Sequence, residues 1–168
     1  MNLLQKSNLR IGALALVIFA LDQFTKWLVL RSLDEDKVVI PGFFKFVEWG
    51  NTGAAWSLFS GNNAALAFVA LLALVALFLT RHHFDSHTLI GQIAFGLIFG
   101  GIAGNLYDRL SRHEVVDFIR FYMLQRNGNE LGFPAFNVAD SAICTGVGLI
   151  FLITWKNEST PRDVPTGK

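Results

Sequence analysis

Residues 91–109, GQIAFGLIFGGIAGNLYDR, decide the fold class. The stretch has no charged residue before Asp108, and Gly96, Gly100 and Gly104 recur at a spacing of four, which places them on one ridge of a helix. A ridge of small residues lets membrane helices approach each other closely. The sequence therefore predicts a membrane-spanning helix that packs against a neighbour and carries polar residues at one end.

The composition of the whole chain agrees with a membrane protein. Hydrophobic residues make up 52% of the 168 residues and charged residues 16%, whereas soluble domains have about 25% charged residues. A formal net charge of +1 argues against a nucleic-acid-binding surface. The single cysteine, Cys144, excludes a disulfide framework and is expected to be a small core residue.

Gaps between charged residues predict four membrane-spanning helices within one integral membrane domain over residues 1–168. We place the helices near residues 11–30, 63–80, 88–107 and 138–155. Four spans put both termini on one side of the membrane. Lys6 and Arg10 precede the first span and acidic residues follow it, which favours cytoplasmic termini. No small-residue cleavage site follows the first apolar run, so this helix is expected to be retained.

The segments between the first and second spans and between the third and fourth spans are expected on the outer face. β-Branched and aromatic runs broken by Pro41-Gly42 and Asn51-Thr52-Gly53 predict a small strand unit near 38–58, and residues 114–122 have the same character. The expected fold class is an all-α membrane protein with four transmembrane helices and a small β-strand unit on its outer face. We expect the Phe and Trp side chains of these segments at the lipid headgroups.

Polar residues in the spans need a physical reason, because they are costly in a bilayer. Asp22 and Lys26 stand four apart in the order that favours an ion pair, and we expect them to lock the bundle rather than to act in chemistry. Asn105, Asp108 and Arg109 cluster at the outer end of the third span. Arg109 either extends to the interface or belongs to a site.

Asp117 and Asp140 lie on the same side of the membrane among apolar neighbours. Asp140 follows Asn137 by three residues at the start of the fourth span, where capping of the helix alone would explain both residues. Two carboxyl groups in a partly desolvated site share a proton, so one can act as general base and the other as general acid. The pair predicts aspartic-protease chemistry. The alternative is a non-enzymatic membrane scaffold or proton-relay protein, although a relay needs ionisable groups across the whole bilayer.

Four blocks of residues in this order resemble the bacterial lipoprotein signal peptidase family, also called signal peptidase II. The resemblance covers nearly the whole chain. The blocks are Asp22-Gln23-Phe24-Thr25-Lys26, Asn51-Thr52-Gly53-Ala54-Ala55-Trp56-Ser57, Gly104-Asn105-Leu106-Tyr107-Asp108-Arg109 with Val116-Asp117-Phe118, and Phe136-Asn137-Val138-Ala139-Asp140-Ser141.

The resemblance implies an aspartyl endopeptidase of the bacterial inner membrane that cleaves diacylglyceryl-modified prolipoproteins before the lipidated cysteine. Its active site is expected near the outer, periplasmic face, with Asp117 and Asp140 as the catalytic dyad. By position, the residues implied to line or brace the substrate pocket are Asn51, Asn105, Arg109 and Asn137, and those implied to be structural are Asp22, Lys26 and Asp108.

The family also has an outer β-cradle, which fits the strand unit, and a mobile outer helix, which would fall near Asn62 or earlier. No metal ion and no organic cofactor is implied. The expected partners are lipid-modified prolipoprotein substrates and membrane lipids, without nucleic acid, and the enzyme is expected to act as a monomer. Arg109 would hydrogen-bond a substrate carbonyl or hold Asp108, and the sequence leaves both open.

Overall fold

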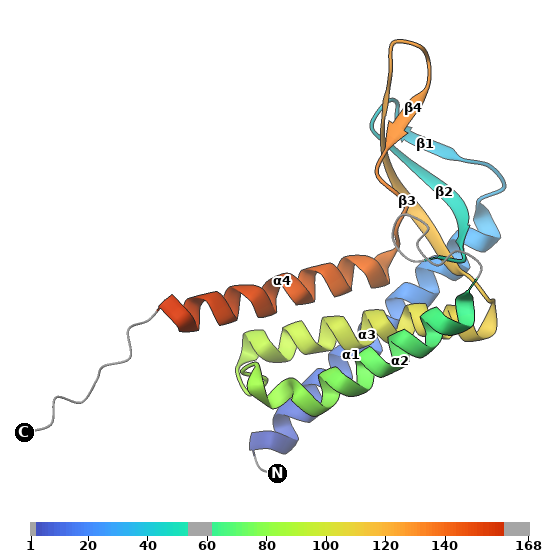
Figure 1. The fold of residues 1–168 in the computed structure, drawn as a ribbon. Coiled ribbons are helices and arrows are strands. Elements are labelled where there is room, and N and C mark those ends of the chain that lie inside the picture. The colour runs from blue at the N-terminus through green and yellow to red at the C-terminus, as the bar shows by residue number, and fades with distance from the viewer. Residues whose placement is uncertain (1–2, 54–61, 160–168) are drawn as a thin grey trace, which may run out of the picture.

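The computed structural model describes residues 3–53 and 62–159, and within them it contains four long helices and one four-stranded sheet (Figure 1). All four helices are long and apolar enough to cross a membrane. The predicted fold class is confirmed. In chain order the elements are α1 (Leu3–Ser32), β1 (Lys37–Ile40), β2 (Phe44–Asn51), α2 (Asn63–Thr80), the 3-10 turn η2 (Arg81–His83), α3 (Leu89–Ser111), β3 (Val115–Leu124), β4 (Glu130–Gly132) and α4 (Val138–Ser159).

Helices α1, α3 and α4 extend beyond the charge-free stretches that located them. Helix α2 has the expected bounds, whereas α1 begins at Leu3, eight residues before the expected start. Lys6 and Arg10 end the uncharged stretch but do not end the helix, because lysine and arginine are good helix formers. Helix α3 likewise runs on to Ser111, which places Asp108 inside a helix.

Helix α3 packs against the other three helices and is the most buried of them. A Cβ atom at Gly100 would lie 2.6 Å from the carbonyl oxygen of Ala15, closer than real Cβ atoms approach. The glycine ridge therefore lets α1 and α3 touch along their backbones. On another face of α3, a Cβ at Gly101 would lie 2.5 Å from the carbonyl oxygen of Ala139 at the start of α4. The polar end of α3 is thus held close to both α1 and α4.

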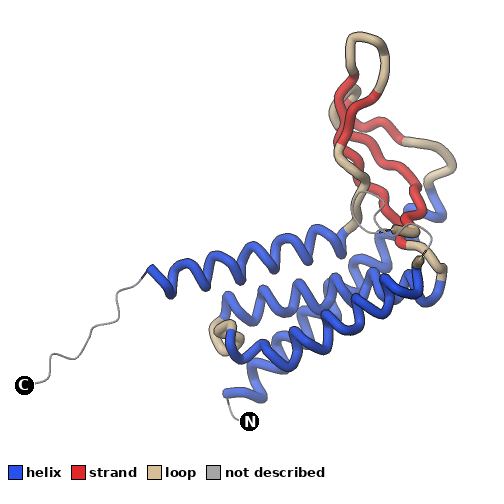
Figure 2. Tube along the Cα trace, viewed as in Figure 1, coloured by secondary structure: helices blue, strands red, loops and turns tan. Residues whose placement is uncertain are grey.

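The antiparallel sheet has the order β1-β2-β3-β4 and lies at one end of the helical bundle, while the start of α1 and the end of α4 lie toward the other end (Figures 1 and 2). Strands β1 and β2 fall in the segment expected to form a strand unit, and they share one sheet with β3 and β4. Trp49 on β2 pairs with Asp117 on β3 after an irregularity in the register. The aromatic run at 55–58 and any helix shortly before Asn62 lie outside the described residues.

A second ion cluster, which the sequence does not predict, holds the sheet together. Lys45 on β2 is buried, and its ammonium donates to Asp36 at 2.9 Å and to Glu130 at 3.1 Å. Burial lowers the pKa of Lys45, but the hydrogen bonds and the negative charges of the two carboxylates together raise it by more, so the net pKa lies above its usual value. Arg120 also reaches Glu130, at 3.2 Å. This cluster joins the entry to β1 with β2, β3 and β4.

Candidate functional site

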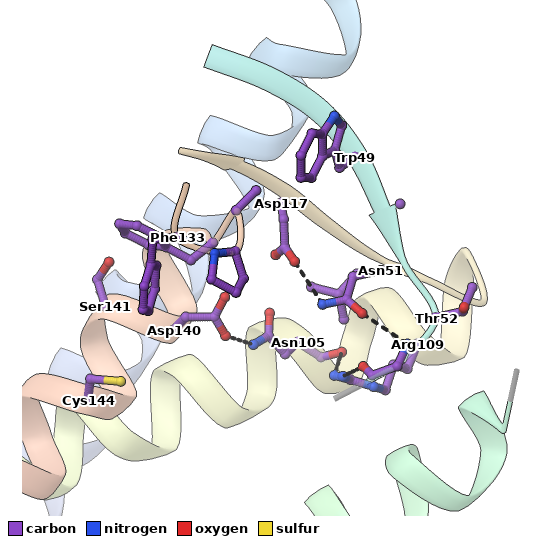
Figure 3. A pocket seen from close by; sticks show the side chains of 16 residues that line it. Trp49, Asn51, Thr52, Asn105, Arg109, Asp117, Phe133, Asp140, Ser141 and Cys144 are labelled. Carbon is purple, nitrogen blue, oxygen red and sulfur yellow. Dashed lines mark hydrogen bonds between the residues drawn. The ribbon is translucent and has the colours of Figure 1, made fainter. Parts of the chain in front are cut away.

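A pocket of about 770 Å³ lies where the sheet meets the bundle (Figure 3). Its walls come from the end of β2, the end of α3, β3, the segment before α4 and the first turns of α4. The lining residues are Trp49, Gly50, Asn51, Thr52, Gly53, Asn105, Arg109, Val115, Asp117, Phe133, Pro134, Ala135, Phe136, Asp140, Ser141 and Cys144. The pocket therefore collects residues from three of the four blocks quoted above.

Asp117 and Asp140 enter this pocket from different elements. Asp117 lies on β3 and is 4% exposed, while Asp140 lies in the first turn of α4. Figure 3 shows both carboxyl groups pointing into the pocket. The two acids are 23 residues apart in sequence, and the sheet and bundle bring them to one site.

Burial raises the pKa of Asp117 to about 7, and the negative charge of Asp140 raises it as well. Hydrogen bonds from Asn51 and Asn137 and the charge of Lys26 act in the opposite direction without cancelling this effect. Asp117 is therefore largely protonated below neutral pH. Such a carboxyl group can donate a proton to a substrate, which an ordinary surface aspartate cannot do near neutrality.

Two asparagines present their amide N–H groups to Asp117. Asn51 Nδ2 donates to Asp117 at 2.9 Å, and its oxygen accepts from the main-chain N–H of Gly53 at 2.9 Å. Asn137 Nδ2 donates to Asp117 at 2.8 Å, and its oxygen accepts from the main-chain N–H of Asp140 at 2.9 Å. Because each amide oxygen faces a main-chain donor, each amide nitrogen must face the acid.

Asn105 presents its amide N–H group to Asp140 in the same way. Its Nδ2 donates to Asp140 Oδ1 at 2.7 Å, and its oxygen accepts from Lys26 Nζ at 3.0 Å and from Asn137 Nδ2 at 3.2 Å. Asn105 and Asn137 therefore connect the two acids through amide hydrogen bonds. The structure brings together the residues that were expected to line or brace a pocket.

The residues expected to be structural form a buried ion cluster behind the pocket. Lys26 Nζ lies 2.7 Å from a carboxylate oxygen of Asp22 and 2.7 Å from one of Asp108, and all three side chains are fully buried. Asp22 also accepts from the main-chain N–H of Ala139 at 2.9 Å, which ties α1 to the start of α4. Gln23 donates to Asp22 at 3.2 Å and to Asp108 at 3.0 Å. No role was predicted for Gln23, although its position beside Asp22 in an apolar span was a usable signal.

Arg109 lines the pocket and does not pair with Asp108, which is held by Lys26 and Gln23. Its guanidinium donates to the main-chain oxygens of Asn105 at 3.3 Å and Gly53 at 3.2 Å. The buried Nε atom of Arg109 has no hydrogen-bond partner among the described residues.

The expectation that Cys144 is a core residue is wrong. Cys144 is exposed and lines the pocket together with Ser141. The residues of α4 that are buried include Ala139 and Ala142, which face the bundle. Cys144 is four residues after Asp140, so helical spacing already indicated that the two share a face. Three aromatic residues that line the pocket, Trp49, Phe133 and Phe136, were also not predicted as part of the site.

Within residues 3–53 and 62–159, no group of three His, Cys, Asp or Glu side chains is arranged to hold a metal ion. The ionisable groups that line the pocket are two carboxyl groups, one guanidinium and the thiol of Cys144. Paired carboxyl groups of unequal proton affinity can activate water and protonate a carbonyl oxygen. The arrangement can therefore support hydrolysis of an amide bond by acid–base catalysis.

Comparisons with known proteins match nearly the whole chain. The family model described as signal peptidase (SPase) II matches residues 14–156. A lipoprotein signal peptidase of Anoxybacillus flavithermus is 35% identical over 156 residues, covering 92% of this chain and 90% of that protein. One from Symbiobacterium thermophilum is 40% identical over 142 residues, covering 83% and 90%. A solved structure described as a bacterial membrane enzyme superposes with a TM-score of 0.73 at 31% identity, covering 97% of this chain and 95% of that one.

Proposed function

Because the chain belongs to the signal peptidase II family, we propose that it removes the signal peptide from diacylglyceryl-modified prolipoproteins by cleaving before the lipidated cysteine. The chain is a membrane protease, and the relatives that it matches are named lipoprotein signal peptidases. One observation carries the assignment of the chemistry to particular residues. Asp117 and Asp140 enter a single pocket, where Asn137 hydrogen-bonds to both.

The proposed reaction assigns different roles to the two acids. Asp140, whose carboxylate accepts N–H bonds from Asn105 and Asn137, takes a proton from water as the water oxygen attacks the scissile carbonyl carbon. Asp117, whose pKa is about 7, gives its proton to the carbonyl oxygen. When the resulting diol collapses, the carbon–nitrogen bond breaks, the proton on Asp140 goes to the leaving amine, and a diol hydroxyl returns a proton to Asp117.

The pocket walls suit a substrate with a peptide part and a lipid part. Arg109 and Asn51 supply polar groups, and in this proposal the guanidinium of Arg109 donates to a substrate carbonyl. Phe133 and Phe136 supply an apolar wall. In this proposal the peptide lies along the polar wall and the acyl chains remain with the apolar one, so that neither part is transferred into an unfavourable environment.

The proposed location rests on the four apolar helices and on the charge at the start of α1. We place the chain in the bacterial inner membrane as one integral domain, with cytoplasmic termini and with the sheet and pocket at the outer face. The start of α1, which carries Lys6 and Arg10, lies at the end of the bundle opposite the sheet (Figure 1), and the positive-inside rule favours the cytoplasm for that end. We also propose that the enzyme acts as a monomer and without a cofactor.

The proposal is tested by cleavage of a synthetic prolipoprotein segment by the purified protein in lipid. Wild type is expected to cut the diacylglyceryl-modified peptide before its cysteine and to leave the unmodified peptide intact. Asp117→Asn and Asp140→Asn are each expected to lower kcat by about 10²-fold or more, while Asp34→Asn, at an exposed acid outside the pocket, retains activity. Undiminished cleavage by either pocket variant would exclude the dyad.

A further inference from the structure

The buried ammonium of Lys26 faces the side-chain amide of Asn105, and that amide bonds to Asp140. Lys26 Nζ lies 3.0 Å from Asn105 Oδ1, and Asn105 Nδ2 lies 2.7 Å from Asp140 Oδ1. An ammonium group has three donors and no acceptor, so the amide atom that faces it has to be the oxygen. The amide nitrogen then has to face Asp140. Lys26 is thus the closer of the two donors that determine which amide atom the acid meets.

Asn105 differs in this respect from the other two asparagines of the site. The donors that orient Asn51 and Asn137 are main-chain N–H groups, which are retained when side chains are substituted. The donor on the opposite side of Asn105 is the side chain of Lys26, with a second bond from Asn137 Nδ2 at 3.2 Å. The orientation of this one amide is therefore open to change by mutation.

The position of Lys26 is itself fixed by charge. Asp22 and Asp108 each lie 2.7 Å from its Nζ, and all three side chains are fully buried. Two carboxylates on one ammonium leave it little freedom to turn away from Asn105, because a buried charge without its partners is costly. The ion cluster therefore holds a donor against the amide that contacts Asp140.

We propose that Lys26 is a positioning residue for the dyad, which orients Asn105 so that an N–H group, and not a carbonyl oxygen, meets Asp140. If the amide of Asn105 were reversed, its oxygen would face the carboxylate of Asp140, and two acceptors would repel each other. Asp140 would then have to carry the proton that Asp117 otherwise holds. The acid and base of the reaction would then be exchanged. This inference rests on the proposed function, to which it adds a residue and a reason for the division of roles.

A double substitution separates this role from simple packing. Lys26→Met with Asp108→Asn removes one cation and one anion, so the net charge of the buried cluster is unchanged, and Asp22 keeps its bonds to Ala139 and Gln23. The matched control is Lys45→Met with Asp36→Asn in the sheet. This control also removes a buried lysine together with one of its carboxylate partners. The second carboxylate, Glu130, keeps its ion pair with Arg120, as Asp22 keeps its bonds in the other variant.

Steady-state cleavage of the lipidated peptide and thermal unfolding are measured for both double variants and for wild type. We expect the Lys26 variant to lose about tenfold or more in kcat with KM within about twofold, and the optimum of its pH profile to move. The Lys45 variant is expected to lose thermal stability but to keep kcat and the pH profile of wild type. The charged groups around the dyad that bear on this profile are Asp22 and Lys26 on α1 and Asp108 and Arg109 on α3.

A folded Lys26 variant with the kcat and pH profile of wild type overturns the proposal. If this double variant does not insert, Lys26→Arg and Lys26→Gln make the same comparison. Arg has only donors and is expected to retain more activity, whereas Gln has an acceptor that allows the amide to reverse. Equal kcat values for these two variants also overturn the proposal. A failure of the proposed function is distinct, because wild type itself would then not cleave the lipidated peptide.

Discussion

Asn137 and Asp140 cap the N-terminus of α4 reciprocally. Asn137 Oδ1 accepts from the main-chain N–H of Asp140 at 2.9 Å, and Asp140 Oδ2 accepts from the main-chain N–H of Asn137 at 3.2 Å. This is the geometry of a capping box, in which two side chains satisfy two otherwise unpaired N–H groups. The other oxygen of Asp140 bonds to Asn105 in the pocket. Capping and a role at the site are therefore compatible, and the cap helps to orient the acid.

Substitutions of Asn137 are expected to separate the cap from the contact with Asp117. Asn137→Ser keeps a side-chain oxygen that can cap the helix but loses the amide N–H that bonds to Asp117 at 2.8 Å. Asn137→Ala loses both functions, and the missing cap should cost about 1 kcal/mol more in unfolding free energy. We expect both variants to lose activity, and only the alanine variant to lose the capping energy. Unfolding midpoints in detergent and cleavage rates check this, and an unimpaired rate for Asn137→Ser would contradict it.

The rate of cleavage is expected to fall as the pH rises through about 7. Asp117 has to carry a proton to act as general acid, and burial beside Asp140 raises its pKa to about 7. Loss of the hydrogen bond from Asn51, which holds this pKa down, should move the alkaline limb of kcat/KM to higher pH in Asn51→Ala. The pH profiles of wild type and variant provide the test. A limb that stays in place, or moves to lower pH, would argue against Asp117 as the acid.

The same pKa predicts a pH-dependent cost to stability. The pKa of Asp117 is raised in the folded protein from 3.8 to about 7, so the folded state favours the protonated form. The cost of ionising the buried group is absent below about pH 4, grows as the pH rises, and reaches about 4 kcal/mol above pH 7. Asp117→Asn removes this cost. The difference between the unfolding midpoints of this variant and of wild type is therefore expected to grow in favour of the variant from pH 4 to pH 8. A difference that stays constant over this range would contradict the pKa assigned to Asp117.

Much of the fold could be predicted from the sequence, because long uncharged segments have few other uses than spanning a bilayer. The bounds of α2 followed directly from this pattern. The start of α1 did not, since Lys6 and Arg10 interrupt the apolar run without ending the helix. The pairing of β2 with β3 also escaped prediction, because it depends on a contact between segments that are far apart in sequence.

The site was predictable where polar residues stand out against apolar neighbours, as Asp117 and Asp140 do. The hydrogen-bond or ion-pair partner of each polar group was not predictable. Asp108 was grouped with Arg109, its neighbour in sequence, yet it bonds to Lys26 on another helix. Cys144 was placed in the core because no histidine in the spans could activate it, although its spacing from Asp140 put the two on one face of the helix.

The glycine ridge gives a prediction about stability with an internal control. A Cβ at Gly100 would lie 2.6 Å from the carbonyl oxygen of Ala15, on a helix backbone that can yield only by moving α1 away from α3. Gly100→Ala is therefore expected to cost about 1–3 kcal/mol of unfolding free energy. At Gly12 on α1, a Cβ would meet no described atom within 4 Å, so Gly12→Ala is expected to be neutral or slightly stabilising.

Unfolding midpoints of the two variants in the same detergent check this contrast. Because Gly100 lies one turn from Gly104, where α3 touches Asp22, separation of α1 and α3 should also disturb the ion cluster and lower the cleavage rate of Gly100→Ala. Equal midpoints for the two alanine variants would show that α1 and α3 tolerate a wider separation than the ridge indicates. A destabilised Gly100→Ala variant with full activity would instead show that the pocket does not depend on this contact.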